Sequence, residues 1–298
     1  MKVYDCFMFF DEEMLLDLRL NIMDKYVDKF VITEATYFHS GKPKKLIFDI
    51  NKFSKFKDKI IYIVVDKMPP DIEKMNDDDS KFKIDEKLIN NSIKRENFQR
   101  EMAQKSLMNL DSDDVILIND LDEIPNLNNI NLKTIKNNII IFKQKTFSYK
   151  FNLLYESLDW YGSRACKKKE FISPQWLRSL KHKKYPFWRI DTLFSKIKYT
   201  NISYIENGGW HFTNIKSAED IEKKYANFLH HQDYEHSGLN LENIKKILKD
   251  KKVLYDQSAD QRDFKWKGLI DLKKVKLSEM PDYLSKNYEK YSKWIDDE

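Results

Sequence analysis

The chain has 298 residues, of which 41% are hydrophobic and 14% aromatic, so it can bury a substantial core. Its formal net charge of +5 is spread over many lysines and carboxylates, which excludes the concentrated basic arm typical of nucleic-acid binding. No apolar run approaches the ~18 residues of a membrane-spanning helix, and Asp5 interrupts any signal-peptide core. Cys6 and Cys166 lie far apart in apolar surroundings, which is typical of reduced packing residues. We therefore expect a soluble, cytoplasmic protein with no membrane span and no nucleic-acid partner.

Strand and helix patterns alternate through the first part of the chain. Apolar runs predict four strands, at residues 3–10, 30–32, 60–65 and 115–118. Apolar residues at helical spacing predict helices over about 14–22 and 92–110, and the polar stretch 71–91 predicts a loop with a short helix. Continuous apolar strands separated by helices indicate an α/β fold, with a largely parallel sheet covered on both faces.

The second part of the chain is richer in β signals. Residues 138–151 are aromatic and β-rich, and a strand at 202–205 leads into Asn207-Gly208-Gly209-Trp210-His211. Ser217-Ala218-Glu219-Asp220 resembles a capping box that starts a helix, and the amphipathic tail 280–294 should pack back on the domain. No stretch rich in glycine or proline divides the chain, so we expect one domain over residues 1–298.

Three carboxylates stand at the end of the predicted strand 115–118, in Asn119-Asp120-Leu121-Asp122-Glu123. Buried strands of open α/β sheets end at the crevice where ligands bind. An Asp-x-Asp pair supplies hard oxygen ligands suited to Mg²⁺ or Mn²⁺ together with the phosphates of a substrate. We interpret the motif as a metal-diphosphate site, with a nucleotide-sugar as the leading candidate. A solvated acidic turn is the alternative.

The acidic residues of this motif and a later histidine are the candidate metal ligands. We assign Asp122 to direct metal ligation, Asp120 to the donor ribose or to the metal through water, and Glu123 to their support. His211, at a strand end after two glycines, is a candidate imidazole ligand suited to Mn²⁺, and its alternative role is packing beside Trp210. Two further histidines compete for that role, namely His230 and His231.

Several blocks along the chain match one known pattern in order and spacing. The blocks are residues 3–12, 18–20, 27–34, 39–43, 96, 99–100, 120–125 and 208–212. In them the chain resembles glycosyltransferase family 17, the enzymes related to β-1,4-mannosyl-glycoprotein 4-β-N-acetylglucosaminyltransferase. The match covers most of the chain and is weakest between about 162 and 203.

The resemblance implies a GT-A-type, Rossmann-like fold with a mostly parallel sheet and flanking helices. It also implies a UDP-sugar donor (UDP-GlcNAc in the characterised animal enzymes), Mn²⁺ or Mg²⁺, and inversion at the anomeric carbon. Residues 1–125 would then form the nucleotide-sugar-binding half and residues 126–298 the acceptor-side half, with a glycan or other hydroxyl as acceptor. Unlike the animal enzymes, this chain is expected to have neither a membrane anchor nor a lumenal stem.

Donor contacts are expected at the first two strand ends. Phe9 and Phe10 would flank the base, while Glu34 would accept from ribose hydroxyls or the uracil N–H. Arg100 would reach the diphosphate, although its spacing from Glu96 also fits a surface ion pair. Core packing is the alternative for the phenylalanines. We interpret Arg19 as structural, and three tryptophans are candidates to line an acceptor site, namely Trp160, Trp176 and Trp188.

An inverting displacement needs a carboxylate base within hydrogen-bond reach of the attacking hydroxyl. Glu219 occupies a place where several GT-A families put their base, although stabilisation of the helix N-terminus is its other possible role. Asp233 is the second candidate, with Glu206 and Asp191 behind it.

Two other classes of function share these features. A nucleotidyl or phosphoryl transferase also uses paired aspartates and Mg²⁺, but the sequence has no glycine-rich phosphate loop or fixed catalytic lysine. A catalytically inactive carbohydrate-binding GT-A protein is the other alternative, and the intact acidic motif argues against it. Our hypothesis is a metal-dependent, inverting hexosyltransferase that moves a sugar, GlcNAc as the first choice, from a UDP-sugar to a glycan hydroxyl.

Overall fold

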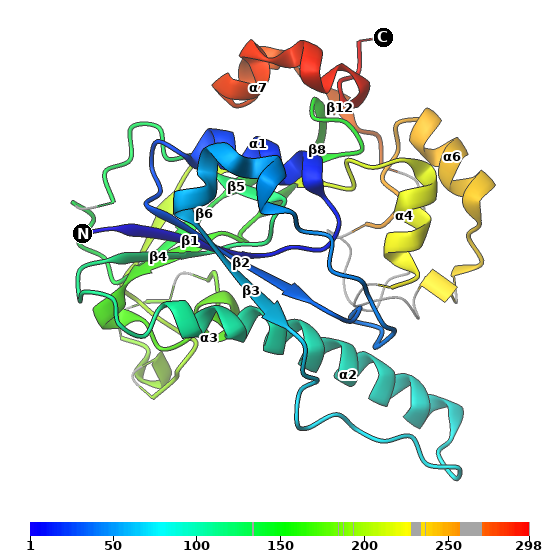
Figure 1. Ribbon diagram of the computed structural model, residues 1–298, viewed down its shortest axis with the longest axis horizontal. Coiled ribbons are helices and arrows are strands. Elements are labelled where there is room, and N and C mark those ends of the chain that lie inside the picture. Colours follow the sequence, from blue (N-terminus) through cyan, green and yellow to red (C-terminus); the bar gives the residue numbers. More distant parts are fainter. Residues whose placement is uncertain are drawn as a thin grey trace.

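The computed structural model describes residues 1–132, 134–183, 185–186, 188–192, 194–227, 234–235, 237–256 and 270–297. Within these residues the chain forms an α/β structure with two mixed sheets and flanking helices (Figure 1). The strands are β1 (Val3–Met8), β2 (Lys29–Ala35), β3 (Ile60–Val65), β4 (Val115–Ile118), β5 (Glu123–Pro125), β6 (Ile139–Phe142), β7 (Gln144–Ser148), β8 (Leu153–Trp160), β9 (Arg164–Lys167), β10 (Ile202–Ile205), β11 (Gly209–Thr213) and β12 (Lys273–Lys274). The helices are α1 (Glu13–Met23), α2 (Lys81–Glu101), α3 (Pro174–Ser179), α4 (Ala218–Tyr225), α6 (Leu241–Lys249) and α7 (Asp282–Lys286).

The larger sheet contains the four strands predicted from apolar runs. Among the described strands its order is β10-β6-β9-β4-β1-β2-β3, and β4, β1, β2 and β3 are mutually parallel. Strand β9 runs antiparallel to both of its neighbours, so the sheet is mixed. Cys6 pairs with Val31 on one side and Ile118 on the other, which brings the carboxyl ends of β1, β2 and β4 to one edge.

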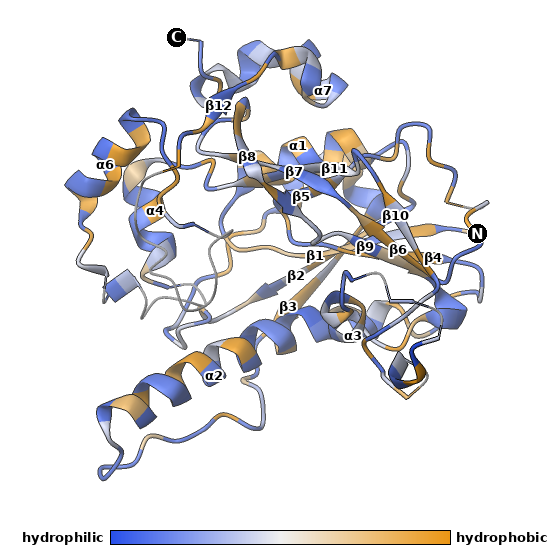
Figure 2. Ribbon diagram, turned by 180° about the vertical axis from the view of Figure 1, so that it is seen from behind, coloured by the Kyte–Doolittle hydropathy of each residue, from blue (hydrophilic) through white to orange (hydrophobic). Residues whose placement is uncertain are grey.

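Both faces of this sheet are covered, as the apolar strands predicted. Alternate residues of β1 enter different clusters, with Phe7 packed among leucines of α1 and Cys6 packed near Trp176 and Leu177 of α3. Figure 1 shows α1 on one side of the sheet and α2 with α3 on the other. Figure 2 shows β4, β6 and β9 as hydrophobic strands between these layers.

The smaller sheet joins the acidic motif to the predicted histidine. Its order among the described strands is β12-β8-β7-β11-β5, and the antiparallel pairing of β5 with β11 sets Glu123 opposite His211. The C-terminal tail packs back on the body as expected. Tyr291 is fully buried against Phe151, and its hydroxyl donates to Asp17 at 2.8 Å.

The helix predicted from residue 92 begins earlier, at Lys81. The stretch 71–91, predicted as a loop with a short helix, is therefore a loop only up to Ser80, and the long helix ends at Glu101 rather than near residue 110. The early turns lack an apolar stripe and are stabilised by polar contacts instead. Ser80 caps the helix, and the side chain of Asn91 exchanges two 2.8 Å hydrogen bonds with the backbone of Glu73. Figure 1 shows this half of α2 extending away from the body.

Two further expectations are met. Cys6 and Cys166 are free and buried, and burial raises the pKa of both thiols. Ser217 caps α4 by accepting the N–H of Asp220 at 3.1 Å. No helix in the described parts of the chain has the length and apolar character needed to cross a bilayer.

Candidate active site

The acidic loop after β4 is fixed from behind by Arg19. This fully buried side chain of α1 donates to the carbonyl oxygens of Asp120 and Leu121 at 3.2 Å each. It also donates to the carbonyl of Glu123 at 2.6 Å, and its remaining nitrogens bind the buried carboxylate of Asp5 at 2.9 and 2.7 Å. Arg19 therefore shapes the loop from the core side, which agrees with the structural role predicted for it.

Glu123 is fully buried beneath the loop. Its carboxylate accepts from Trp160 Nε1 at 2.5 Å and from two nitrogens of Arg178 at 2.8 and 2.7 Å. The backbone of Gly162 passes so close that an added Cβ would lie 2.0 Å from Glu123 Oε1. A side chain at position 162 would push the Glu123 carboxylate out of place. The glycine therefore allows Glu123 to keep its position.

Both carboxylate oxygens of Asp120 are held by arginines. Oδ1 accepts from Arg100 at 3.1 Å and Oδ2 accepts from Arg178 at 2.6 Å. Burial opposes ionisation of this carboxyl, but attraction to Arg178 and Arg100 outweighs it and places the pKa of Asp120 well below its usual range. Arg100 also binds Glu96 at 2.7 Å and is buried, so the predicted surface pair is instead part of the site.

Asp122 differs from Asp120 in its surroundings. Its carbonyl accepts the N–H of Phe212 at 2.8 Å, and its Oδ2 lies 3.8 Å from Nε2 of His211. Burial raises the pKa of Asp122 to about 7, and the nearby negative charges of Glu123 and Asp120 add to the rise against the pull of Lys224. A positive charge brought to this carboxylate would therefore favour its ionised form.

His211 presents one ring nitrogen toward Asp122. Its ring stacks on Trp160 with centroids 4.5 Å apart, and Thr146 Oγ1 lies 3.4 Å from Nδ1. Burial lowers the pKa of His211 to about 4, so the ring is neutral at neutral pH. Its packing partner is Trp160 rather than the predicted Trp210.

The described residues do not assemble a three-ligand metal cluster from histidine, cysteine, aspartate and glutamate side chains. The carboxylate of Asp122 and the imidazole of His211 are the two predicted ligands that face each other. Both atoms are of the type that binds Mn²⁺, and the neutral state of His211 leaves a lone pair for ligation.

A cleft of about 230 Å³ opens in front of this loop. It is lined by Met8, Phe9, Phe10, Glu12, His39, Glu96, Gln99, Asp120, Leu121, Asp122, Lys224 and Asn227. Phe9 is 1% exposed and packs on Phe48, as its core alternative predicted, whereas the ring of Phe10 remains partly open. The fold thus brings together Phe9, Asp120 and Asp122 in the cleft, with Arg100 and His211 directly behind the carboxylates.

Glu34 is not brought to the cleft. Its fully buried carboxylate accepts from Tyr62 at 2.8 Å and from the backbone N–H groups of Ile47 and Phe48 at 2.9 and 3.1 Å, and it pairs with Lys44. The carboxylate therefore holds the segment 44–48 across the end of β2. Its predicted contact with the donor nucleotide would require these bonds to break.

Three of the four predicted bases are among the described residues, and none of the three lines the cleft. Glu219 is 59% exposed, pairs with Lys245 at 3.2 Å and does not line the cleft. Glu206 and Asp191 are in exposed ion pairs with Lys143 and Arg189. Asp233, His230 and His231 lie outside the described residues.

Comparison with known proteins shows the family to which the chain belongs. The model for glycosyltransferase family 17 matches residues 1–295. The chain belongs to glycosyltransferase family 17. No curated protein sequence matches it significantly. A solved structure, the crystal structure of HddC from Yersinia pseudotuberculosis, is similar at 9% identity over 70% of this chain and 92% of that chain, with a TM-score of 0.33.

As a family 17 member the protein is a glycosyltransferase, with a sugar donor and an acceptor. Its site contains two positively charged side chains that the sequence analysis did not identify. Arg178 comes from the short helix α3 and clamps Asp120 and Glu123, although no motif marks it. Lys224, on α4, is the one lysine or arginine among the described residues that line the cleft.

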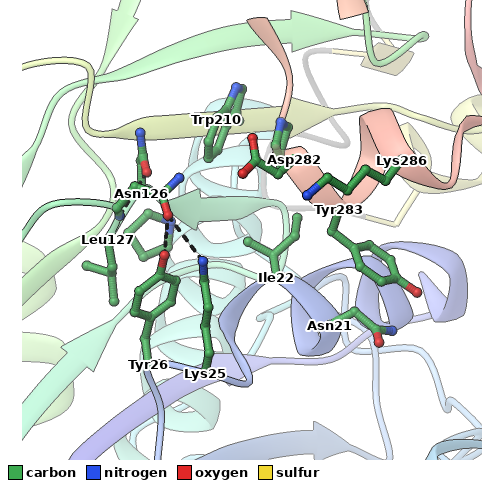
Figure 3. Close-up of a pocket in the computed structure, with 13 residues that line it drawn as sticks. Asn21, Ile22, Lys25, Tyr26, Asn126, Leu127, Trp210, Asp282, Tyr283 and Lys286 are labelled. Carbon is green, nitrogen blue, oxygen red and sulfur yellow. Dashed lines mark hydrogen bonds between the residues drawn. The ribbon is translucent and has the colours of Figure 1, made fainter. Parts of the chain in front are cut away.

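A second pocket of this glycosyltransferase lies on the far side of β11. Figure 3 shows it between the end of α1, the segment after β5, and α7. Its volume is about 240 Å³. Trp210 lines this pocket and donates to the carbonyl of Glu279 at 3.0 Å, whereas its chain neighbour His211 faces Asp122. Successive residues of a strand point to opposite faces, so β11 separates the pocket from the acidic cleft.

Proposed function

We propose that the protein is a metal-dependent, inverting glycosyltransferase with a GT-A-type fold, which moves GlcNAc from a UDP-sugar to a glycan hydroxyl. The observation that carries the proposal is the pairing of Asp122 with His211 at the cleft, 3.8 Å apart, where β4 ends. The parallel order β3-β2-β1-β4 and the ligand cleft at its carboxyl edge support the GT-A assignment.

Asp122 and His211 would hold the divalent cation, since an ionised carboxylate and a neutral imidazole suit Mn²⁺. When bound, the cation would neutralise charge that builds on the departing diphosphate. Asp120 would remain with Arg100 and Arg178, where it fixes both guanidinium groups beside the cleft. The direct ligand in this proposal is thus Asp122, and Asp120 acts through its neighbours or a water.

Two other cleft residues suit an anionic nucleotide, namely Lys224 and Phe10. Lys224 faces a lining that contains four carboxylates and would bind the diphosphate once the metal offsets part of that charge. The partly open ring of Phe10 offers a stacking face for the base. Phe9 would form the floor beneath it.

Proton removal from the acceptor requires a carboxylate inside the cleft. Glu12 lines it, with its Oε1 3.2 Å from Lys216. Burial opposes its ionisation, but Lys216 and Lys224 outweigh burial and lower the pKa of Glu12, so it is ready to accept a hydrogen bond from a hydroxyl. We propose Glu12 or Asp233 as the base, with Glu219 as the alternative.

A thermal-shift screen of nucleotide-sugars tests this function. We expect UDP-GlcNAc to raise the melting temperature in the presence of Mn²⁺ and much less after chelation with EDTA. Stabilisation by GDP- or TDP-sugars alone would disprove the UDP donor. A stabilised protein that releases no UDP with any acceptor or water would favour the inactive carbohydrate-binding alternative.

A further inference from the structure

The segment that follows α3 exposes three large apolar side chains within seven residues. Trp188 is 68% exposed, Ile190 is 70% exposed and Phe194 is 85% exposed. Single exposed apolar residues are common on soluble proteins, but a group of large ones marks a surface that meets an apolar partner. We call residues 181–198 the basic-apolar loop.

The same loop is rich in positive charge. Lys181, Lys183 and Lys196 are exposed within it. Its sequence has one carboxylate, Asp191, which already binds Arg189 at 2.7 Å and Lys198 at 2.8 Å. The sequence of the loop thus carries a clear excess of positive charge.

The loop is anchored at its base. The N–H of Lys181 donates to the carbonyl of Ile197 at 2.8 Å, and Trp176 Nε1 donates from α3 to the carbonyl of Lys196 at 2.7 Å. His182 stacks on Tyr161 with centroids 4.8 Å apart. Figures 1 and 2 show the chain beyond α3 projecting from the body on that side of the sheet. The described ends of the loop are therefore held against the body.

We propose that the basic-apolar loop docks this protein on the surface of a membrane that contains anionic lipids. Exposed tryptophan and phenylalanine side chains with flanking lysines are the chemistry that inserts into the headgroup region and binds lipid phosphates. A second copy of the chain fits less well, because it would present the same positive charge to the first. The inference goes beyond the proposed function and does not depend on the donor or the metal.

Vesicle flotation with the full-length chain tests the inference. We expect binding to vesicles of phosphatidylcholine mixed with phosphatidylglycerol and weak binding to phosphatidylcholine alone. The triple variant Trp188→Ser/Ile190→Ser/Phe194→Ser should lose at least about tenfold in affinity, because it removes the apolar surface that would leave water on binding. Phe82→Ser is the matched control, because Phe82 is 78% exposed on the distant α2, and it should bind as the wild type does.

A second variant separates charge from apolar contact. Lys181→Gln/Lys183→Gln/Lys196→Gln should lose the preference for phosphatidylglycerol, because each lysine is attracted to anionic lipid, and should melt at the wild-type temperature. Failure of the wild type to bind either vesicle would overturn the inference, as would equal binding by the apolar triple variant. Light scattering that shows a wild-type dimer and a monomeric triple variant would assign the loop to contacts between copies instead.

Discussion

Arg178 and Glu123 form a two-bond ion pair, at 2.8 and 2.7 Å, and the same guanidinium reaches Asp120 at 2.6 Å. One side chain from α3 therefore sets the relative positions of two acidic residues that lie three apart in the chain. Because Glu123 is fully buried, it depends on this pair for its charge balance.

Arg178→Met should damage both stability and activity. Removal of one partner from a buried ion pair costs about 3–5 kcal/mol, and misplacement of the acidic loop should lower kcat roughly 100-fold. Chemical denaturation and UDP-release kinetics measure the two effects. Arg189→Met is the control, because its pair with Asp191 is exposed, so its loss should leave stability nearly unchanged. Equal effects of the two substitutions would contradict the clamp.

Asp122→Asn should abolish metal-dependent transfer and change the response of stability to pH. The folded protein keeps the Asp122 proton up to a pKa of about 7, whereas the unfolded chain loses it near pH 3.9. The folded state therefore binds more protons between these values, and this group makes stability fall as pH rises through that window. In metal-free buffer at pH 8 the variant should be more stable than wild type, by up to about 4 kcal/mol, and the gain should fade toward pH 4.

Manganese should reverse that comparison. At pH 8 Mn²⁺ should raise the melting temperature of the wild type and leave Asp122→Asn nearly unchanged, and the wild-type affinity for Mn²⁺ should fall below about pH 7 as the carboxyl is protonated. Equal stabilisation of both proteins by Mn²⁺ would remove Asp122 as the metal ligand.

Lys224→Met should weaken UDP binding about tenfold or more, because a charge-assisted hydrogen bond contributes about 1.5–3 kcal/mol. Uridine lacks the diphosphate, so its affinity should not change. Titration calorimetry compares both ligands. Lys223→Met, one residue earlier on an exposed face of α4, is the matched control. A parallel loss for UDP and uridine would place Lys224 at the nucleoside instead.

Glu12→Gln should reduce kcat about 100-fold or more if its carboxylate takes the acceptor proton. Glu219→Gln should stay within roughly twofold of wild type, because that side chain is exposed and paired with Lys245 outside the cleft. Asp233→Asn completes the set. A large loss confined to Glu219→Gln would show that the original assignment of the base was correct.

The sequence predicted the scaffold of the site better than its details. The apolar run at 115–118 predicted β4 with both ends correct, because an unbroken aliphatic stretch before an acidic turn has few other structures. The position of the acidic loop at the edge of the sheet followed from its place directly after a buried apolar strand. The clamp by Arg178 did not, since its partner Glu123 lies 55 residues away and no local pattern encodes that contact.

Glu34 shows the limit of arguments from strand ends. Its place at the end of β2 suggested a ligand contact. The segment 44–48 instead folds over Glu34, and two backbone N–H groups of that segment donate hydrogen bonds to its carboxylate. The burial of Arg100 has a similar cause. The i,i+4 spacing of Glu96 and Arg100 had suggested an exposed pair on α2, but α3 packs over this face and its Gln175 accepts a hydrogen bond from Arg100. Both outcomes depend on contacts between segments that are distant in the sequence, and the periodicity of apolar residues does not predict such contacts.

The burial of both thiols has a practical consequence for later experiments. Cys6 and Cys166 are buried and are the two native cysteines of the chain. A cysteine introduced on the surface would therefore be the accessible thiol that reacts with a maleimide dye. Placed at Ile190 or at Lys223, such a dye would report on bilayer contact or on nucleotide arrival without removal of any native residue from the interior.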